Sequence, residues 1–167
     1  MGIQERVSAF TTKNVGIVNR LLNDVTVKYN EKSNVVKALW DTGATGTCIS
    51  YDVVNKLSLI ATCKKNIQTP SGTGVVNTYL IDIQLPNNVN IKDVEVCDSE
   101  IGSQGIDVLI GMDIINLGDL SVSNYNNATV FSFRLPSSQT TDYVKQIAVQ
   151  NIIGTPHGPG KRKNKKK

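Results

Sequence analysis

The sequence predicts a mostly β domain that carries one or two short helices. Hydrophobic residues make up 40% of the 167 residues, and many of them are valine and isoleucine, which favour strands. They occur in short runs bounded by glycine, asparagine, proline and serine, the residues that favour turns. The length suits one domain with tails and is too short for two full lobes. We therefore expect a single all-β domain in each chain.

The N-terminal half begins with a hairpin and a short helix. Alternating apolar residues predict strands at residues 25–29 and 35–40, with a polar turn between them. Ser50 is a suitable N-cap, and Val53, Val54 and Leu57 are spaced along one helical face. The sequence therefore predicts a helix over residues 51–57.

A second hairpin follows, with a glycine-containing turn at residues 69–74. The apolar residues that share one parity in its returning strand are Val75, Tyr79, Ile81, Ile83 and Leu85. A change of parity near Asp93 predicts a β-bulge in the next strand. Residues 106–115 are almost continuously apolar, which indicates a strand buried on both faces that runs into Gly111 and a helical turn.

The C-terminal third contains a hairpin at residues 120–123 and 129–135 and an amphipathic helix near residues 142–150. These elements suggest four regions of the chain. They are a flexible N-terminal arm at residues 1–16, the β domain at residues 17–136, a C-terminal extension with a short helix at residues 137–153, and a disordered basic tail at residues 154–167.

The formal charge of +4 is concentrated in the tail, since six of the eighteen basic residues lie within residues 161–167. Without them, twelve basic residues face fourteen acidic ones, a net charge of −2 for residues 1–160. The folded part is therefore not a basic nucleic-acid binder. We interpret the lysines of residues 161–167 as part of a solvated extension. The alternative is that they bind RNA, DNA or an anionic membrane surface.

The remaining composition excludes several kinds of site. Three cysteines without CxxC spacing argue against a disulfide framework or a zinc site, and indicate free thiols in a reducing compartment. The single histidine, His157, lies in the tail, so we expect neither a histidine-based triad nor a metal or other cofactor. The first twenty residues lack a secretory apolar run and no segment is long enough to span a membrane, so we expect a cytoplasmic location.

The stretch Ala38–Thr45 carries one carboxylate, Asp41, from the end of an apolar strand into a glycine turn. A carboxylate in such a place is costly unless it is paired or used. Hydrolysis of an amide needs a base and an acid, and two close carboxylates that share one proton fill both roles. Because the chain has one such stretch, a pair requires two copies related by a two-fold axis.

Leu39-Trp40-Asp41-Thr42-Gly43-Ala44 resembles the active-site motif of the retropepsins, the retroviral-type aspartic proteases. Val108–Asp113 resembles their second motif, in which two apolar residues precede a glycine. The resemblance extends over about residues 20–135 and is nearest to the bacterial and mobile-element branch. It implies a closed β-barrel of the acid-protease type with one lobe per chain, and an endopeptidase that acts on polypeptides as a homodimer.

The resemblance also implies a role for individual residues. Asp41 is the catalytic aspartate, supported by Thr42, Gly43 and Ala44, and Ile110-Gly111 packs behind the catalytic turn. The flap that closes on substrate comprises Thr69, Ser71, Gly72, Thr73, Gly74, Val75 and Val76. Two features depart from the family pattern, namely the bulky Trp40 and the stretch Thr45-Gly46-Thr47, where an acidic residue is usual.

Other interpretations of the same residues remain. Asp-Thr-Gly also occurs as a simple strand-to-turn motif, although the flanking apolar residues and the distant Gly111 motif make chance a poor explanation. Asp113 is a second candidate carboxylate, which we interpret as a helix cap. The alternative function is a catalytically silent dimerisation or peptide-binding module of the same fold, which holds an extended chain by β-addition.

Overall fold

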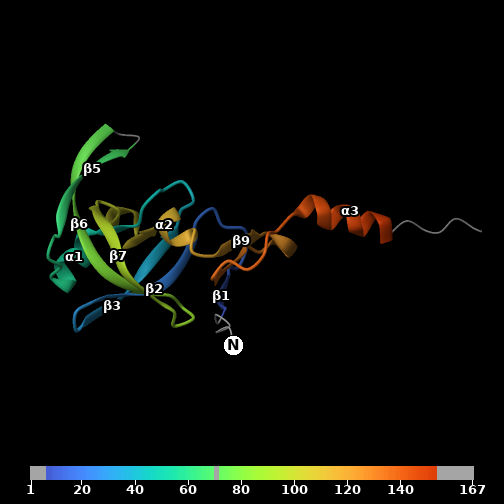
Figure 1. Cartoon of the computed structure of the whole chain (residues 1–167), viewed down its shortest axis with the longest axis horizontal. Coiled ribbons are helices and arrows are strands. Elements are labelled where there is room, and N and C mark those ends of the chain that lie inside the picture. Colours follow the sequence, from blue (N-terminus) through green and yellow to red (C-terminus); the bar gives the residue numbers. More distant parts are fainter. Residues whose placement is uncertain (1–6, 70–71, 154–167) are drawn as a thin grey trace, which may run out of the picture.

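The computed structural model describes residues 7–69 and 72–153, and nearly half of these residues lie in strands (Figure 1). The strands are β1 (Ser8–Lys13), β2 (Leu21–Tyr29), β3 (Lys32–Trp40), β4 (Cys48–Ser50), β5 (Cys63–Thr69), β6 (Gly72–Gln84), β7 (Asn90–Ser99), β8 (Val108–Ile110), β9 (Asp119–Ser123) and β10 (Val130–Leu135). The helices are α1 (Tyr51–Leu57), α2 (Met112–Ile115) and α3 (Tyr143–Ile153), with single 3-10 turns at Gly102–Gln104 and Tyr125–Asn127. The mostly β class is confirmed.

Six strands close into a barrel. Their order is β2-β3-β8-β4-β7-β6, and a further pairing of β6 with β2 completes the ring. The seventh strand of this sheet, β5, pairs with β6 and continues the β6 arm beyond the barrel, at the upper left of Figure 1. The barrel interior is filled by valine and isoleucine side chains such as Val27, Ile83 and Val108, none of which is exposed.

The predicted hairpin of residues 25–40 and the predicted helix of residues 51–57 are confirmed. β2 and β3 form the expected hairpin, and both strands extend beyond their predicted limits. The Ser50 side chain accepts a hydrogen bond from the Val53 amide at 3.3 Å and so caps α1. Val53 and Leu57 are buried, so this cap and the apolar face together fix α1 against the barrel.

The β6–β7 pair contains the expected bulge. Its register shifts between Ile81 and Ile83, and Asp93 on the opposite strand has a positive φ of 54°. The inward parity holds from Tyr79 onward, but Val75 is 67% exposed. Val75 shares this parity but stays exposed because this end of β6 pairs with β5 in the arm beyond the barrel.

Residues 8–13 correct the prediction of a loose N-terminal arm. They form β1, which pairs antiparallel with β10 from Ser8–Leu135 to Lys13–Val130. With β9 these strands make a second, three-stranded sheet in the order β1-β10-β9. The partner that holds β1 in place is β10, which lies more than a hundred residues away in the sequence. The alternation of apolar residues within one short segment does not reveal such a distant partner.

Trp40 joins this small sheet to the barrel. Its ring lies 4.9 Å from that of Phe133 and 5.6 Å from that of Phe10, measured between centroids. The indole N–H donates to Asn23 Oδ1 at 3.0 Å, so the polar end of the buried ring is also satisfied. The bulk of Trp40 therefore fills the junction behind the strand end that leads to Asp41.

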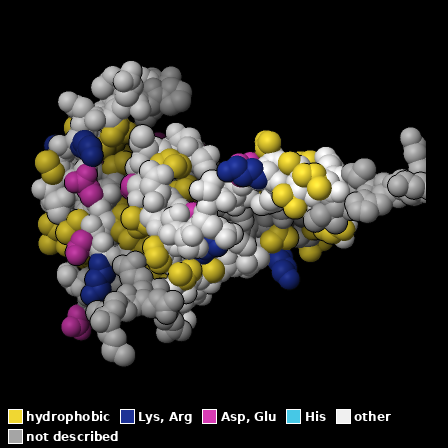
Figure 2. Space-filling view, turned by 45° about the vertical axis from the view of Figure 1, so that its right-hand side comes forward, with side chains coloured by type: hydrophobic (Ala, Val, Ile, Leu, Met, Phe, Trp, Pro, Cys, Tyr) yellow, Lys and Arg dark blue, Asp and Glu magenta, His cyan; other side chains and the backbone are white. Residues whose placement is uncertain are grey.

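The helix α3 covers residues 143–153 and points away from the barrel (Figure 1). Its apolar side chains are exposed and form much of the apolar surface at the right of Figure 2; they include Tyr143, Val144, Ile147, Val149 and Ile152. Among the described residues, no helix is long and apolar enough to cross a membrane. The basic tail at residues 154–167 lies outside the described residues.

A buried carboxylate stabilises the β6–β7 pair. Asp98 is 3% exposed and accepts hydrogen bonds from the Asn77 amide (3.0 Å), Asn77 Nδ2 (2.7 Å) and the Tyr79 hydroxyl (3.0 Å). Burial, followed by the bond to Asp98, raises the pKa of Tyr79 above its usual value. Asp98 is thus the acceptor for three donors at the base of the arm.

Replacing Asp98 with alanine leaves these donors without a partner, and should lower the free energy of unfolding by about 3 kcal/mol in a urea titration. Asp24→Ala is the matched control, because the Asp24–Lys37 ion pair is exposed and should contribute less than about 1 kcal/mol. Equal midpoints for the two variants would contradict the role given to Asp98.

Candidate active site

Asp41 begins the loop that follows β3. Its backbone N–H donates to the Ile110 carbonyl at 3.0 Å, which continues the β3–β8 pairing by one residue. The Gly43 N–H donates to Asp41 Oδ1 at 2.8 Å, a contact that orients the carboxylate. Within the described residues, Asp41 Oδ2 accepts no hydrogen bond, so this oxygen is available to a water or substrate group.

The rest of this loop is tied to the residues that follow β8. The Met112 N–H donates to the Ala44 carbonyl at 2.8 Å, and the Asp113 N–H donates to the Thr45 carbonyl at 3.2 Å. The predicted support residues therefore do two different things, because Gly43 binds the carboxylate while Ala44 binds the second motif. Thr42 is exposed, and its hydroxyl has no hydrogen-bond partner among the described residues.

Gly111 lies where the second motif crosses the loop. A Cβ at this position would lie 2.6 Å from the carbonyl carbon and oxygen of Gly46, a separation that two backbone segments do not allow. Ile110, the preceding residue, is fully buried in the barrel. The predicted packing role of Ile110-Gly111 thus corresponds to a contact between backbones that leaves no room for a side chain.

Asp113 does more than the predicted helix cap. Its Oδ1 accepts from the Ile114 amide at 2.9 Å, as a cap does, and also from the Thr47 hydroxyl at 2.7 Å. Its Oδ2 accepts from the Thr47 amide at 2.8 Å. Thr47 is 1% exposed. The sequence did not reveal that it binds Asp113, because there it stood out only as a departure from the family pattern.

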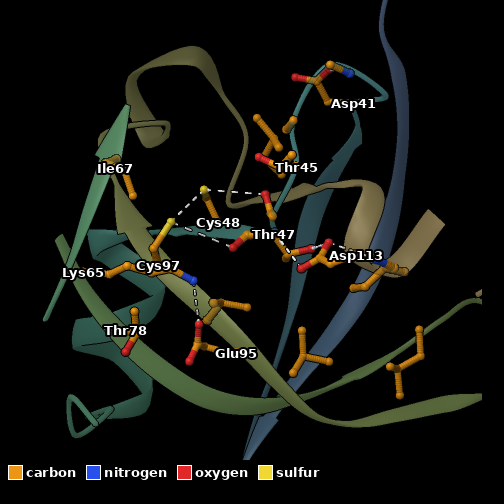
Figure 3. A pocket seen from close by; sticks show the side chains of 18 of the residues that line it. Asp41, Thr45, Thr47, Cys48, Lys65, Ile67, Thr78, Glu95, Cys97 and Asp113 are labelled. Carbon is orange, nitrogen blue, oxygen red and sulfur yellow. Dashed lines mark hydrogen bonds and ion pairs between the residues drawn. The ribbon is translucent and has the colours of Figure 1, made fainter. Parts of the chain in front are cut away.

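A cavity of about 880 Å³ opens beside this loop (Figure 3). The loop from Asp41 to Cys48 forms one side of it, and residues of β5, β7 and α2 form the others. Asp41 lies at one end of the view in Figure 3, and Lys65 and Glu95 lie toward the other. Asp41 is therefore placed at the margin of a space large enough for several residues of a peptide.

The hairpin of β5 and β6 contributes differently from the prediction. Lys65, Ile67 and Gln68 of β5 line the cavity, and none of them was named as a flap residue. The predicted flap residues from Gly72 to Val76 lie on the outer part of the same hairpin and do not line the cavity of the single chain. Ser71 lies outside the described residues.

The charges in the cavity can be sorted by their partners. Glu95 binds Lys65 at 3.0 Å, and this contact raises the pKa of Lys65. Both oxygens of Asp113 are bonded to Thr47. No cluster of three or more metal-ligating side chains occurs within residues 7–69 and 72–153. Among the described carboxylates that line the cavity, Asp41 is the one that has neither a cationic partner nor hydrogen bonds to both of its oxygens.

The fold is similar to known structures. A retropepsin-like aspartic protease from Rickettsia conorii aligns with a TM-score of 0.52 and 13% identity, over 80% of this chain and 99% of that chain. The EIAV protease in complex with the inhibitor HBY-793 aligns with a TM-score of 0.44 and 20% identity, over 58% of this chain and 86% of that chain. The first of these similarities confirms the predicted barrel of the retropepsin type.

A comparison with curated proteins returns no match. A protein-family model described as gag-polyprotein putative aspartyl protease matches residues 25–117. This range contains both the Asp41 loop and the Gly111 motif, and it spans more than half of the chain. The chain therefore belongs to the gag-polyprotein aspartyl protease family and has the retropepsin-like fold.

Proposed function

We propose that this protein is an aspartic endopeptidase that works as a homodimer, with the Asp41 side chains of two copies at one site. The observation that carries the proposal is that Asp41 Oδ2 accepts no hydrogen bond among the described residues, whereas Glu95 is paired with Lys65 and both oxygens of Asp113 are bonded to Thr47. One carboxylate can serve as a base or as an acid in amide hydrolysis, but the reaction needs both. A second copy of the chain supplies the other.

In this dimer the two carboxylates share one proton, because two like charges a few ångströms apart do not both ionise readily. The ionised Asp41 takes a proton from the water that attacks the peptide carbonyl carbon. The protonated Asp41 gives its proton to the carbonyl oxygen, and a proton then passes to the nitrogen as the carbon–nitrogen bond breaks. The Gly43 N–H holds each carboxylate in place through Oδ1.

Several surfaces support this arrangement. The exposed Thr42 hydroxyl is available for a hydrogen bond across the two-fold axis. β5 pairs with β6 along one edge only among the described strands, so its other edge can add an extended substrate strand. The outer part of the β5–β6 hairpin would close on that strand, with Gly72, whose φ is +125°, and Gly74 as its flexible points.

The experiment measures cleavage and assembly together. The purified chain should cut a peptide library, and a statine-type transition-state mimic should stop the cutting. Sedimentation should show a dimer. Dilution that dissociates the dimer should remove the activity. A chain that binds peptides and never cuts them would contradict the proposal, and would support the silent peptide-binding module of the same fold.

A further inference from the structure

Two cysteines face each other beside the proposed catalytic loop. Cys48 in β4 and Cys97 in β7 are directly opposite in a parallel register, and their sulfur atoms lie 3.0 Å apart (Figure 3). Neighbouring strands lie about 4.8 Å apart, which is within the Cα separations of roughly 4.4–6.8 Å that a disulfide spans. The two thiols, both free in this structure, can therefore bond while the two strands stay paired.

Both cysteines belong to the cavity wall. They line the same space as Asp41, and each is partly accessible rather than buried. Cys48 directly follows Thr47, whose hydroxyl and amide bind Asp113. The Cys97 N–H in turn donates to the Thr47 carbonyl at 3.2 Å. A change at the sulfur pair thus acts on the end of the loop that carries Asp41.

The pair is also chemically asymmetric. Either thiol can donate across this contact; when the Cys48 thiol donates to Cys97 Sγ, the hydrogen bond stabilises the Cys97 thiolate and lowers the pKa of Cys97 to about 7. The same contact, together with burial, raises the pKa of Cys48 above its usual value. Because the thiolate is the nucleophile, Cys97 is the sulfur that reacts first with an oxidant that enters the cavity.

We propose that Cys48 and Cys97 form a reversible redox switch that turns down the peptidase by closing a disulfide across the wall of the substrate cavity. This proposal rests on the proposed function, because the disulfide would regulate the same peptidase site. The oxidant is a peroxide. Cys97 sulfur attacks one peroxide oxygen, the O–O bond breaks and water leaves, and Cys97 becomes a sulfenic acid. Cys48 sulfur then attacks Cys97 sulfur, the S–O bond breaks, and a second water leaves.

Over both steps the two thiols lose two electrons and two protons, and one hydrogen peroxide becomes two waters. The sulfur atoms move from 3.0 Å to a bond of about 2.05 Å. This draws β4 toward β7 and shifts Thr47, which is held between Asp113 and the Cys97 amide. A displacement of this size at a catalytic constellation is expected to lower kcat/KM about tenfold or more.

The test uses the full chain, fully reduced and then treated with hydrogen peroxide. The mass of the intact protein should fall by two hydrogen atoms, and peptide mapping should identify a disulfide between Cys48 and Cys97. The rate of peptide cleavage should fall about tenfold and should recover after treatment with dithiothreitol. Cys63→Ser is the matched control, because Cys63 is exposed and does not line the cavity. This variant should respond to peroxide as the wild type does.

Two further variants separate the steps. Cys97→Ser should lose the response to peroxide, whereas Cys48→Ala should stop at the sulfenic acid and gain the mass of one oxygen at Cys97. The redox switch would be refuted if the chain kept all its thiols after peroxide treatment. It would also be refuted if the Cys48–Cys97 disulfide formed and kcat/KM stayed unchanged. Neither result bears on the proposed peptidase function. A reduced chain that cuts no peptide refutes the proposed function and this regulation with it.

Discussion

Replacing Asp41 with asparagine should lower kcat/KM for a peptide substrate on the order of 10³-fold or more, because asparagine can neither take nor give the proton that the reaction needs. The change removes little else. The asparagine side chain has almost the same shape, and its Oδ1 can still accept from the Gly43 N–H at 2.8 Å. The free energy of unfolding should therefore stay within about 0.5 kcal/mol of the wild-type value.

Asp52→Asn is the matched control, since Asp52 is an exposed carboxylate in the first turn of α1 and does not line the cavity. It should cleave peptides at the wild-type rate. An Asp41→Asn chain that cleaved as fast as the wild type would remove Asp41 from the mechanism and leave the fold intact.

Mixing the two chains tests whether the site is shared. If a site needs Asp41 from both copies, an equal mixture that has exchanged subunits should retain about a quarter of the wild-type activity, since only dimers of two wild-type chains cut. Retention of half the activity would show that each chain works alone, and would contradict the shared pair.

Replacing Gly111 with alanine should lower the free energy of unfolding by about 3 kcal/mol, because the new methyl group would lie 2.6 Å from the Gly46 backbone. The end of β8 and the Asp41 loop must separate to accept it. Two hydrogen bonds span that contact, Met112 N–H to the Ala44 carbonyl and Asp113 N–H to the Thr45 carbonyl. We therefore also expect kcat/KM to fall about tenfold or more, even in the folded fraction.

Gly46→Ala is the matched control for stability, since it adds a methyl group to the opposite partner of the same contact. A Cβ at Gly46 meets nothing within 4 Å, so the urea midpoint of Gly46→Ala should match that of the wild type. If Gly111→Ala were equally stable, the close backbone contact would not be the reason for glycine at this position.

The sequence by itself determined the parts of this protein that local rules control. Period-two alternation located the β2–β3 hairpin, Ser50 located the start of α1, and the change of parity near Asp93 located the bulge. The Asp41 and Gly111 motifs predicted the retropepsin-like fold, which the Rickettsia structure confirms. Each of these signals is contained within about ten neighbouring residues, where strand and cap preferences act.

Only the tertiary structure decided which distant groups meet. β1 becomes ordered through β10, and Asp113 binds Thr47 across 66 residues of sequence. Cys48 and Cys97, 49 residues apart, come together because β4 and β7 are parallel neighbours in the closed barrel. Alternation in one strand tells which side of a sheet a residue takes, but it does not tell which strand lies beside it. That choice depends on closure of the whole barrel, which is why the groups that surround Asp41 could not be predicted from the sequence.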